Sequence, residues 1–325
     1  AYRHAQTKAE VEAARPRTPR RILVAGGSGL VGSALRPFLT LQGHDVIRLV
    51  RRPVRSADEV RWQPALGHLD ARPLEGVDVV INLAGTNLAD RRWTDERRRE
   101  IEQSRIQATR TLVQTIQRMR TKPSLLINAS AVGYYGEGGE RELREGDEVG
   151  SNFLARVCEA WEREARGAEQ VGVRVVCLRT GVILTEAGGM LARLAPIFRL
   201  GVGGPFGYPD HWLSWISLED HLATMQHLMD RPELRGPVNA VGPNPVRIRE
   251  FTAELGRVLH RPSWFPVPAA VLTAVFGMMA KETMLVSQRV VPTRLLEDGF
   301  VFRHPTLRQA LQHGLGRLPS TVERG

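Results

Sequence analysis

Short apolar runs alternate with longer amphipathic stretches from residue 21 onward. The predicted strands are RILVAGG (21–27), HDVIRLV (44–50), VDVVINLAG (77–85), PSLLINAS (123–130) and VRVVCLRT (173–180). Helices are predicted between them over 30–41, 94–118 and 151–171. Strands that are continuously apolar and separated by helices are typical of a parallel sheet covered on both faces. The pattern therefore predicts an α/β fold with a doubly wound parallel sheet of the Rossmann type.

The alternation becomes looser after residue 185. The predicted elements there are a Gly/Pro loop (196–207), a helix (217–230), a strand (236–242) and helical stretches near 247–259, 268–280 and 284–297. We predict a polar linker or arm over 1–20 and a cofactor-binding Rossmann domain over 21–185, to which 209–244 return. Residues 186–208 and 245–325 would then form a smaller, mostly helical domain on the substrate side.

Composition indicates an ordinary soluble globular protein. The 325 residues are 42% hydrophobic and 25% charged, which is typical of that class. The longest apolar stretch, VPAAVLTAVFGMM (267–279), is shorter than the ~20 residues that span a bilayer, so no membrane span is predicted. The two cysteines, Cys158 and Cys177, fall on different predicted elements. A disulfide framework is therefore not expected, and a reduced, cytoplasmic setting fits.

The chain is basic, with 45 Lys and Arg against 35 Asp and Glu, a net charge of +10. Basic residues are interleaved with acids, as in ADRRWTDERRREIEQSR (89–105). That pattern is more typical of a solvated helix face than of a nucleic-acid surface, so no nucleic-acid partner is predicted. The nine histidines form no H-x-x-x-H or H-x-H pair, and the sequence therefore predicts no metal site.

A glycine-rich stretch, ILVAGGSGLVGSAL, joins the first predicted strand to the first predicted helix. It places Gly26, Gly29 and Gly32 in a G-x-x-G-x-x-G frame. Glycines allow a tight turn and a close backbone approach, so that a pyrophosphate can rest on the N–H groups of the helix N-terminus. The strand, turn and helix together favour dinucleotide binding over a turn that binds nothing.

The end of the second predicted strand indicates which dinucleotide is bound. An acidic residue there would take the ribose hydroxyls of NAD, whereas arginine accommodates the 2′-phosphate of NADP. This chain has Arg51 and Arg52 at that position, and guanidinium groups are donors suited to a phosphate. We therefore predict NADP(H), the alternative being two solvated loop arginines.

Several motifs resemble one family. GGSGLVG, NLAG (82–85), NASAVGYYG (128–136) and LRTGVIL (178–184) resemble the extended short-chain dehydrogenase/reductases. SAVGYYG, FRLGVGGPFG and HWLSWISLED narrow this to the atypical, SulA-type epimerase-like NAD(P)-binding family. LLEDGFVFRHPTLRQAL is similar to that family's C-terminal domain of unknown function. YRHAQTKAEVEAARP resembles the linker that follows a START-like domain in some bacterial members, so such an upstream domain is expected in a longer protein.

The resemblance implies which residues line the cofactor. The pyrophosphate would be held by Gly26, Ser28, Gly29, Leu30, Val31 and Gly32, and the 2′-phosphate by Arg51 and Arg52. Leu83, Ala84 and Gly85 would lie on the adenosine side, and Thr180, Gly181 and Val182 near the nicotinamide. All of these segments end predicted strands, where open α/β sheets bind ligands.

The family's proton-transfer residues are largely absent. Its members use a Tyr whose pKa is lowered by a Lys four residues later, a Ser that orients substrate, and an Asn on an earlier helix. Ser130 matches the Ser, but the other positions carry Phe153, Val157 and Arg105. An Arg in such a charged helix is usually solvated.

Two tyrosines close to Ser130 are alternative proton donors. Tyr134 and Tyr135 follow it in NASAVGYYG, so we expect Ser130 with one of them to do the acid/base chemistry. The alternative is that both tyrosines pack or hydrogen-bond locally.

The stretch DHWLSWISLED supplies the candidate substrate residues Trp212, Ser214 and Trp215. Aromatic walls with a hydroxyl suit a small organic ligand, although buried Trp is more often part of a core. Two functions stay open. The first is an NADP-dependent oxidoreductase acting on an unknown small carbonyl or alcohol, and the second is a non-catalytic NADP(H)-binding scaffold or sensor. Sugar epimerisation is disfavoured because it also needs the Tyr–Lys pair.

Overall fold

The computed structural model describes residues 18–317, so most of the predicted arm (1–20) lies outside the described residues. Its centre is an eight-stranded sheet with strand order β13-β8-β6-β5-β1-β2-β3-β4. The strands are β1 (Arg21–Ala25), β2 (Asp45–Val50), β3 (Glu59–Gln63), β4 (His68–Leu69), β5 (Val79–Asn82), β6 (Leu125–Ala131), β8 (Arg174–Thr180) and β13 (Gly236–Ala240). All neighbours pair in parallel except β3 and β4.

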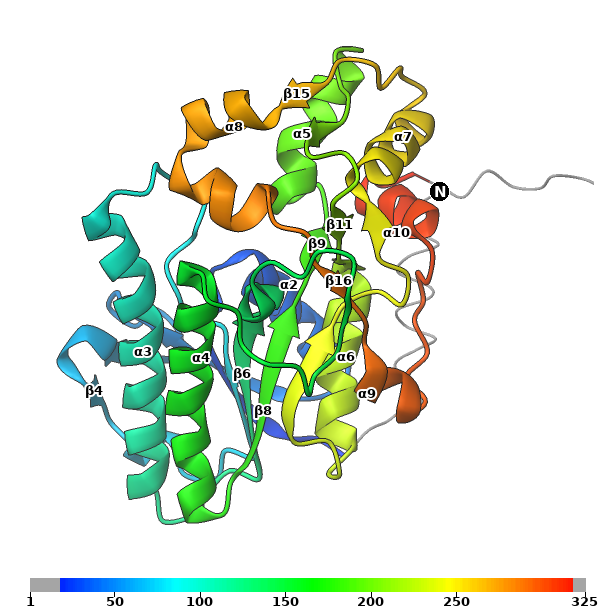
Figure 1. Cartoon of the computed structure of the whole chain (residues 1–325). Coiled ribbons are helices and arrows are strands. Elements are labelled where there is room, and N and C mark those ends of the chain that lie inside the picture. Colours follow the sequence, from blue (N-terminus) through cyan, green and yellow to red (C-terminus); the bar gives the residue numbers. More distant parts are fainter. Residues whose placement is uncertain (1–17, 318–325) are drawn as a thin grey trace, which may run out of the picture.

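Helices cover both faces of this sheet (Figure 1). Helices α2 (Leu30–Leu41) and α6 (Leu218–Asp230) pack on one face together with Ile22 and Val24 of β1. Helices α3 (Asp95–Arg118) and α4 (Phe153–Arg166) cover the other face. Leu23 and Ala25, which alternate with the first pair along β1, belong to the core on that face. Successive strand residues point to opposite faces, so a strand buried on both sides is mostly apolar.

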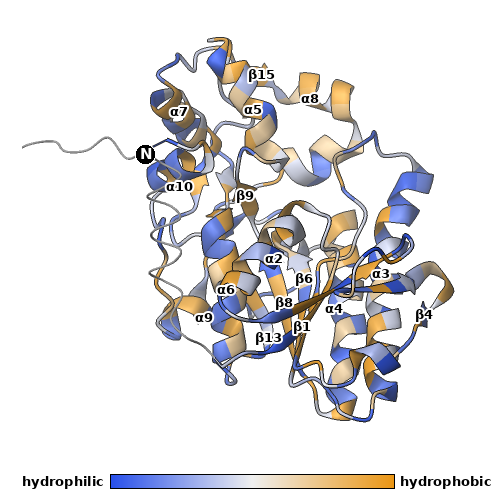
Figure 2. Ribbon diagram, turned by 180° about the vertical axis from the view of Figure 1, so that it is seen from behind, coloured by the Kyte–Doolittle hydropathy of each residue, from blue (hydrophilic) through white to orange (hydrophobic). Residues whose placement is uncertain are grey.

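The hydropathy of the ribbon agrees with this layering. Seen from behind in Figure 2, hydrophobic colour concentrates in the strands, while the helices carry both hydrophobic and hydrophilic residues. The predicted doubly wound Rossmann fold is therefore confirmed. Strand β1 lies between β5 and β2. The strands from β2 to β4 are added on one side of β1 and those from β5 to β13 on the other, so the direction of the strand order reverses there. Open α/β sheets bind ligands beside the carboxyl ends of strands at such a point.

Residues after β13 form a mostly helical region above the carboxyl ends of the strands (Figure 1). Its helices are α7 (Ile248–Leu259), α8 (Ala269–Phe276), a π-helical turn (Ala280–Met284) and α10 (Leu307–Gly314). Helix α9 (Thr293–Glu297) lies apart from them, beside β13, and contributes Leu295 to the core of the sheet. Helix α5 (Gly189–Arg199) shares a core with α7 and α10. Three short strand pairs join this region to the rest of the chain: β10 (Phe206–Gly207) with β15 (Val267–Pro268), β11 (Trp212–Leu213) with β14 (Val246–Arg247), and β7 (Glu142–Leu143) with β16 (Arg289–Val290). A fourth pair, β9 (Val182–Leu184) with β12 (Trp215–Ser217), lies before β13.

Several elements differ from the sequence-based expectation. Strands β3 and β4 were not predicted, because their apolar residues are few and separated by charges. Helix α5 extends into the predicted loop at 196–207, and α10 was not predicted. The predicted helix over 284–297 is wrong in its first part, where β16 precedes Pro292 and only Thr293–Glu297 is an α-helix. A proline has no N–H group, so it favours a helix that begins after it over one that runs through it.

Within residues 18–317, the structure has no helix that combines the length and apolar character needed to cross a membrane. The apolar stretch at 267–279 forms the eight-residue helix α8 and the turn after it. Cys158 and Cys177 are both buried and unpaired.

Replacing Gly32 should destabilise the fold. A methyl group there would lie 2.3 Å from the Gly26 carbonyl oxygen and 2.7 Å from the Gly27 Cα. We expect Gly32→Ala to lower the free energy of unfolding by about 1–3 kcal/mol, the usual cost of overpacking, in urea unfolding. Gly146→Ala is the matched control, because Gly146 has no atom within 4 Å of its Cβ position. Equal stability of the two variants would contradict this packing.

Candidate functional site

The glycine-rich turn after β1 is packed against the end of β5. Gly26 has a φ of +82°, and a Cβ there would lie 2.6 Å from the carbonyl carbon and oxygen of Leu83. Gly29 differs, because its Cβ would meet only the Gly26 oxygen, at 3.4 Å. Gly26 and Gly32 are therefore needed for the turn itself. Gly29, which is exposed, leaves the backbone open to an approaching ligand.

The N-terminus of α2 has the character of an anion site. Its cap residue is Gly29, which supplies no capping side chain, and the first turn contains no acidic residue. The N–H groups of Leu30, Val31 and Gly32 begin the helix and so have no intrahelical acceptor. Together with the helix dipole they favour a bound phosphate. Ser28 is exposed beside them.

The arginines at the end of β2 have unequal surroundings. Arg52 donates to Glu59 at 2.8 and 2.5 Å, and Arg48 donates to the same carboxylate at 2.9 Å. Hydrogen bonds from Arg52 and the Arg55 backbone lower the pKa of Glu59 to about 2. Arg51 is exposed and forms no ion pair with any residue in the described part of the chain.

Arg48 is a candidate that the sequence reasoning missed. Its side chain lies 3.6 Å from the Cβ position of Gly27 in the glycine-rich turn. It also pairs with Asp58 at 3.0 Å, as does Arg36 of α2. A sequence signal was present, because Arg48 interrupts the apolar run that follows Asp45 in β2.

The residues after β5 line the other side of the turn. The Leu83 amide donates to Ala25 O at 2.9 Å, and the Ala84 amide to Asn82 Oδ1 at 3.2 Å. The Cβ position of Gly85 lies 3.2 Å from the side chain of Arg105. These contacts hold Leu83–Gly85 beside the glycine-rich turn, where the sequence predicts the adenosine side.

Arg105 is held in place and is not a solvated surface residue. Its guanidinium donates to Ile101 O at 2.9 Å and Thr86 O at 3.2 Å, and lies 5.2 Å from the Trp161 ring. Burial lowers its pKa to about 10. A cation therefore lies beside Gly85, close to the position where the family places an Asn.

The turn after β8 is closely packed as well. The Gly181 amide donates to Ala240 O at 3.1 Å and the Val182 amide to Ser214 O at 2.8 Å. A Cβ on Gly181 would lie 2.7 Å from Ser214 O. Thr180 is half-buried, and its hydroxyl donates to Leu178 O at 3.3 Å.

A buried ion pair lies behind this turn. Arg179 of β8 donates from Nε to Glu162 Oε1 at 2.8 Å and from Nη2 to Oε2 at 3.0 Å. Both side chains are only 1% exposed. The Ser130 hydroxyl donates to Glu162 Oε1 at 2.7 Å, and Ser130 is itself buried. The proton of the Ser130 hydroxyl is therefore used in a hydrogen bond to a buried carboxylate.

The two tyrosines have different environments. Tyr135 is buried, accepts from Arg179 Nη1 at 3.0 Å and donates to Asn239 Oδ1 at 2.7 Å. Burial raises its pKa to about 12. Tyr134 is half-buried, with its ring 3.4 Å from the Arg179 guanidinium carbon. Its hydroxyl has no hydrogen bond to a residue in the range 18–317, so of the three predicted groups only Tyr134 has an uncommitted hydroxyl.

Helix α4 has apolar contacts where a Tyr and a Lys were expected from the family. Phe153 packs edge-on against Trp93 with ring centroids 5.6 Å apart, and Val157 is 2% exposed. The helix is capped by Asn152, whose Oδ1 accepts from the Ala155 amide at 2.9 Å. Its backbone is intact, and only its reactive side chains have been replaced.

A carboxylate from the C-terminal region also reaches this helix. Glu282 of the π-helical turn accepts from the Leu154 amide at 3.1 Å and from the Phe153 amide at 3.4 Å. A negative charge at a helix N-terminus is stabilising. No local sequence pattern indicates this contact, because it joins residues more than 120 positions apart.

Two of the predicted substrate residues are part of the core. Ser214 donates to Gln288 O at 2.7 Å and accepts from the Val290 amide at 2.8 Å. Trp215 is 1% exposed, and its Nε1 donates to Asn244 O at 3.0 Å. Neither side chain has a polar group directed at a ligand.

Trp212 is half-buried near the surface. Its Nε1 donates to Glu140 Oε2 at 3.0 Å, and its ring centroid lies 4.6 Å from the Arg247 guanidinium carbon and 4.8 Å from that of Arg289. The three predicted substrate residues are neighbours in sequence, but the structure does not bring them together around one cavity.

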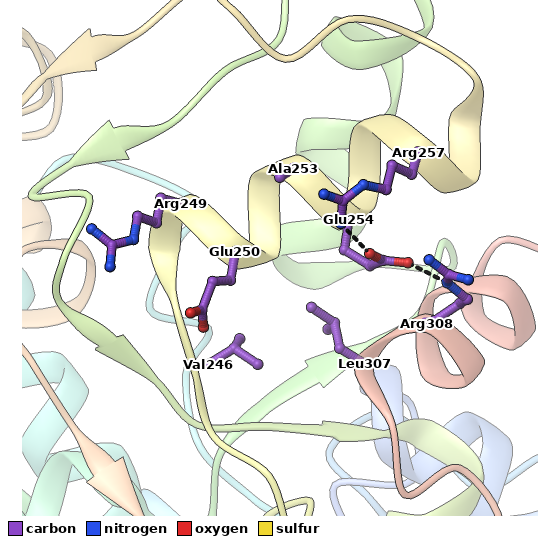
Figure 3. Close-up of a pocket in the computed structure, with 8 residues that line it drawn as sticks. All are labelled: Val246, Arg249, Glu250, Ala253, Glu254, Arg257, Leu307 and Arg308. Carbon is purple, nitrogen blue, oxygen red and sulfur yellow. Dashed lines mark hydrogen bonds and ion pairs between the residues drawn. The ribbon is translucent and has the colours of Figure 1, made fainter.

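A surface pocket of about 500 Å³ lies elsewhere, between α7 and α10 (Figure 3). It is lined by Val246, Arg249, Glu250, Ala253, Glu254, Arg257, Leu307 and Arg308. Glu254 accepts from both Arg257 and Arg308, at 2.8 and 2.5 Å. The pocket is lined by none of the glycines or central-sheet strand ends described above.

The buried ion pair should be strongly coupled. Arg179→Met removes the bidentate partner of the buried Glu162 carboxylate, so we expect a loss of about 3–5 kcal/mol in unfolding free energy. The double variant Glu162→Gln/Arg179→Met should lose less than the sum of the single variants in urea unfolding. The exposed pair Arg110–Glu164 is the control, and Arg110→Met should cost under about 1 kcal/mol. Strict additivity at 162 and 179 would argue against the coupling.

Comparisons with known proteins place this geometry in a family. Residues 22–239 match the NAD dependent epimerase/dehydratase family, and residues 267–314 match a domain of unknown function, DUF1731. An epimerase family protein of Mycobacterium bovis is 43% identical over 91% of this chain and 98% of its own length. The epimerase family protein YfhF of Bacillus subtilis is 36% identical over 89% of this chain and 96% of its own length.

Solved structures give the same assignment. The human epimerase family protein SDR39U1, crystallised with NADPH, is 30% identical with a TM-score of 0.84, covering 92% of this chain and 100% of that one. A nucleoside-diphosphate sugar epimerase from Corynebacterium glutamicum is 32% identical with a TM-score of 0.78, covering 97% of this chain and 63% of that one. The chain therefore belongs to the NAD-dependent epimerase/dehydratase family, among its atypical members that carry the C-terminal domain of unknown function, as the sequence motifs predict.

Proposed function

We propose that this chain is an NADP(H)-dependent oxidoreductase that binds its cofactor across the carboxyl ends of β1, β2 and β5 and acts on a small carbonyl or alcohol. The observation that carries the proposal is the glycine-rich turn. Gly26 and Gly32 are sterically required, whereas Gly29 leaves open space at an uncapped helix N-terminus. The human relative crystallised with NADPH supports the same choice of ligand.

The charges beside β2 favour the phosphorylated cofactor. No carboxylate follows the strand directly, and Arg51 and Arg52 stand there instead. Glu59 and Asp58 together balance two of the three arginines at positions 36, 48 and 52. The exposed Arg51 adds a further positive charge, so a 2′-phosphate would meet an excess of positive charge.

Tyr134 is the group we assign to proton transfer. Its ring lies on the Arg179 guanidinium, 3.4 Å from the guanidinium carbon. During reduction, hydride would pass from the bound cofactor to the carbonyl carbon while the Tyr134 hydroxyl gives its proton to the carbonyl oxygen. Ser130 and Tyr135 would act indirectly, by holding Glu162 and Arg179 in place.

A second function, an NADP(H)-binding scaffold or sensor without turnover, is favoured by one specific observation. Phe153 and Val157 are packed among apolar neighbours, so α4 has no proton-transfer pair. The two functions share the cofactor site and differ only in whether Tyr134 supports turnover.

Cofactor binding should be selective and separable from folding. We expect NADPH to bind at least about 10-fold more tightly than NADH, because charge-assisted bonds to a phosphate contribute about 1.5–3 kcal/mol. Titration by fluorescence measures both affinities. Arg51→Ala should weaken NADPH binding about 10-fold and leave NADH binding unchanged, while Arg163→Ala, an exposed arginine of α4, should change neither.

Gly29→Ala completes the same experiment. Its Cβ has room in the protein but would occupy the path of the pyrophosphate, so binding of both dinucleotides should fall while thermal stability is retained. Equal affinities for NADPH and NADH, or unaltered binding by Gly29→Ala, would contradict the assigned cofactor site.

Tyr134 should control turnover. With a panel of small carbonyl compounds, we expect Tyr134→Phe to reduce NADPH oxidation by at least about 100-fold, the usual contribution of general acid catalysis. NADPH affinity should not change. Tyr208→Phe, at an exposed tyrosine outside this network, is the matched control and should retain activity within a few-fold. Turnover that survives Tyr134→Phe would refute this role, and binding without turnover by the unaltered protein would establish the scaffold function.

A further inference from the structure

Three potential metal ligands meet where α6 and the C-terminal segment touch. Glu219 lies in the first turn of α6, His304 precedes α10, and His313 lies near the end of α10. Glu219 Oε2 is 3.3 Å from His313 Nε2 and 3.7 Å from His304 Nε2. One ligand atom from each residue lies within 4.8 Å of the other two. Sequence spacing could not reveal this group, because Glu219 comes from a distant helix.

The orientation of the His304 ring is fixed by contacts at its Nδ1 atom, away from Glu219. Its Nδ1 lies 3.2 Å from Ser217 Oγ and 3.5 Å from Asp220 Oδ2, and the Asp220 side chain is 1% exposed. Asp220 also accepts from the amides of Arg303 at 2.7 Å and His304 at 3.1 Å. A carboxylate on one ring nitrogen directs the other nitrogen toward a metal, and metal-binding histidines commonly have such a partner.

The spacing of the ligand atoms suits a small tetrahedral ion. Zn²⁺ binds imidazole nitrogen and carboxylate oxygen at about 2.0–2.2 Å, which separates neighbouring ligand atoms by about 3.3 Å. The contacts of Glu219 with the two imidazoles are close to that value. The imidazole rings are stacked with centroids 4.3 Å apart, so both Nε2 atoms can face the same point.

The local charge and access also suit a cation. Glu219 and Asp220 contribute two negative charges against one positive charge on Arg303, which pairs with Glu219 Oε1 and leaves Oε2 toward the histidines. The three ligand side chains are 15–18% exposed. Glu219 and His313 line a cavity of about 730 Å³, which gives an ion a path and leaves room for a water ligand.

We propose that Glu219, His304 and His313 form a Zn²⁺ site that fastens α10 to α6. Two imidazoles and one carboxylate are a ligand set that Zn²⁺ uses with water in the fourth position. The site lies between the Rossmann helix α6 and the region that matches the domain of unknown function. Its role is to fix the C-terminal segment, and it is independent of the cofactor site.

The test measures metal binding by the full chain. Protein freed of metal with a chelator is titrated with ZnCl₂ against a chromophoric competitor, and bound zinc is counted by elemental analysis. We expect one Zn²⁺ per chain and a higher Tm with zinc. His304→Gln and His313→Gln should each weaken binding by at least about 100-fold. His68→Gln, an exposed histidine on β4, should bind as the unaltered chain does.

Co²⁺ provides a second measurement that does not depend on the variants folding. The unaltered chain should saturate with one Co²⁺ and show the intense visible absorption of a tetrahedral site, which added zinc abolishes. Four outcomes would each overturn the proposal. They are binding of less than one zinc per chain, a loss of zinc affinity in His68→Gln equal to that in the other variants, full zinc affinity in a folded His304→Gln or His313→Gln variant, and a weak, octahedral Co²⁺ spectrum. The cluster would then be an ordinary ion-paired contact.

Discussion

The ion pair between Glu162 and Arg179 is the interaction on which the arrangement of this site depends. It joins helix α4 to strand β8 inside the protein, where neither charge reaches water. Burying two charges is costly unless their remaining hydrogen-bonding capacity is used. Ser130, Tyr135 and the Glu145 carbonyl supply those bonds. The hydroxyls of Ser130 and Tyr135, which the sequence predicts as catalytic groups, therefore stabilise the buried charges of Glu162 and Arg179.

The proposed cofactor site and the proposed proton transfer use separate parts of this chain. The proposed cofactor site depends on backbone geometry at Gly26, Gly29 and Gly32, and it does not use any side chain of α4. Phe153 instead packs in an apolar cluster with Trp93. Glu282 ties the same helix end to the C-terminal region. Helix α4 thus joins the Rossmann core to the region above it, and we propose Tyr134 as the proton donor in place of a residue on this helix.

Much of the fold could be predicted from sequence, because strands buried on both faces are mostly apolar and a glycine frame between strand and helix has few alternatives. Strands β3 and β4 were missed since they lie at the sheet edge, where polar residues are tolerated. For the candidate site, local patterns indicated the cofactor segments. They could not indicate that the hydroxyls of Ser130 and Tyr135 face buried partners, because Glu162, Arg179 and Asn239 lie far away in sequence. The cluster of Glu219, His304 and His313 was hidden for the same reason.

A crystal structure of the complex with NADPH tests the central claim most directly, because it shows the cofactor and the candidate proton donor together. The account predicts the pyrophosphate on the amides of Leu30 and Val31, the 2′-phosphate at Arg51, and the Tyr134 hydroxyl as the side-chain group within about 3–4 Å of where a substrate oxygen would lie beside the nicotinamide. A nicotinamide ring facing away from Tyr134, or a pyrophosphate away from the glycine-rich turn, would contradict it.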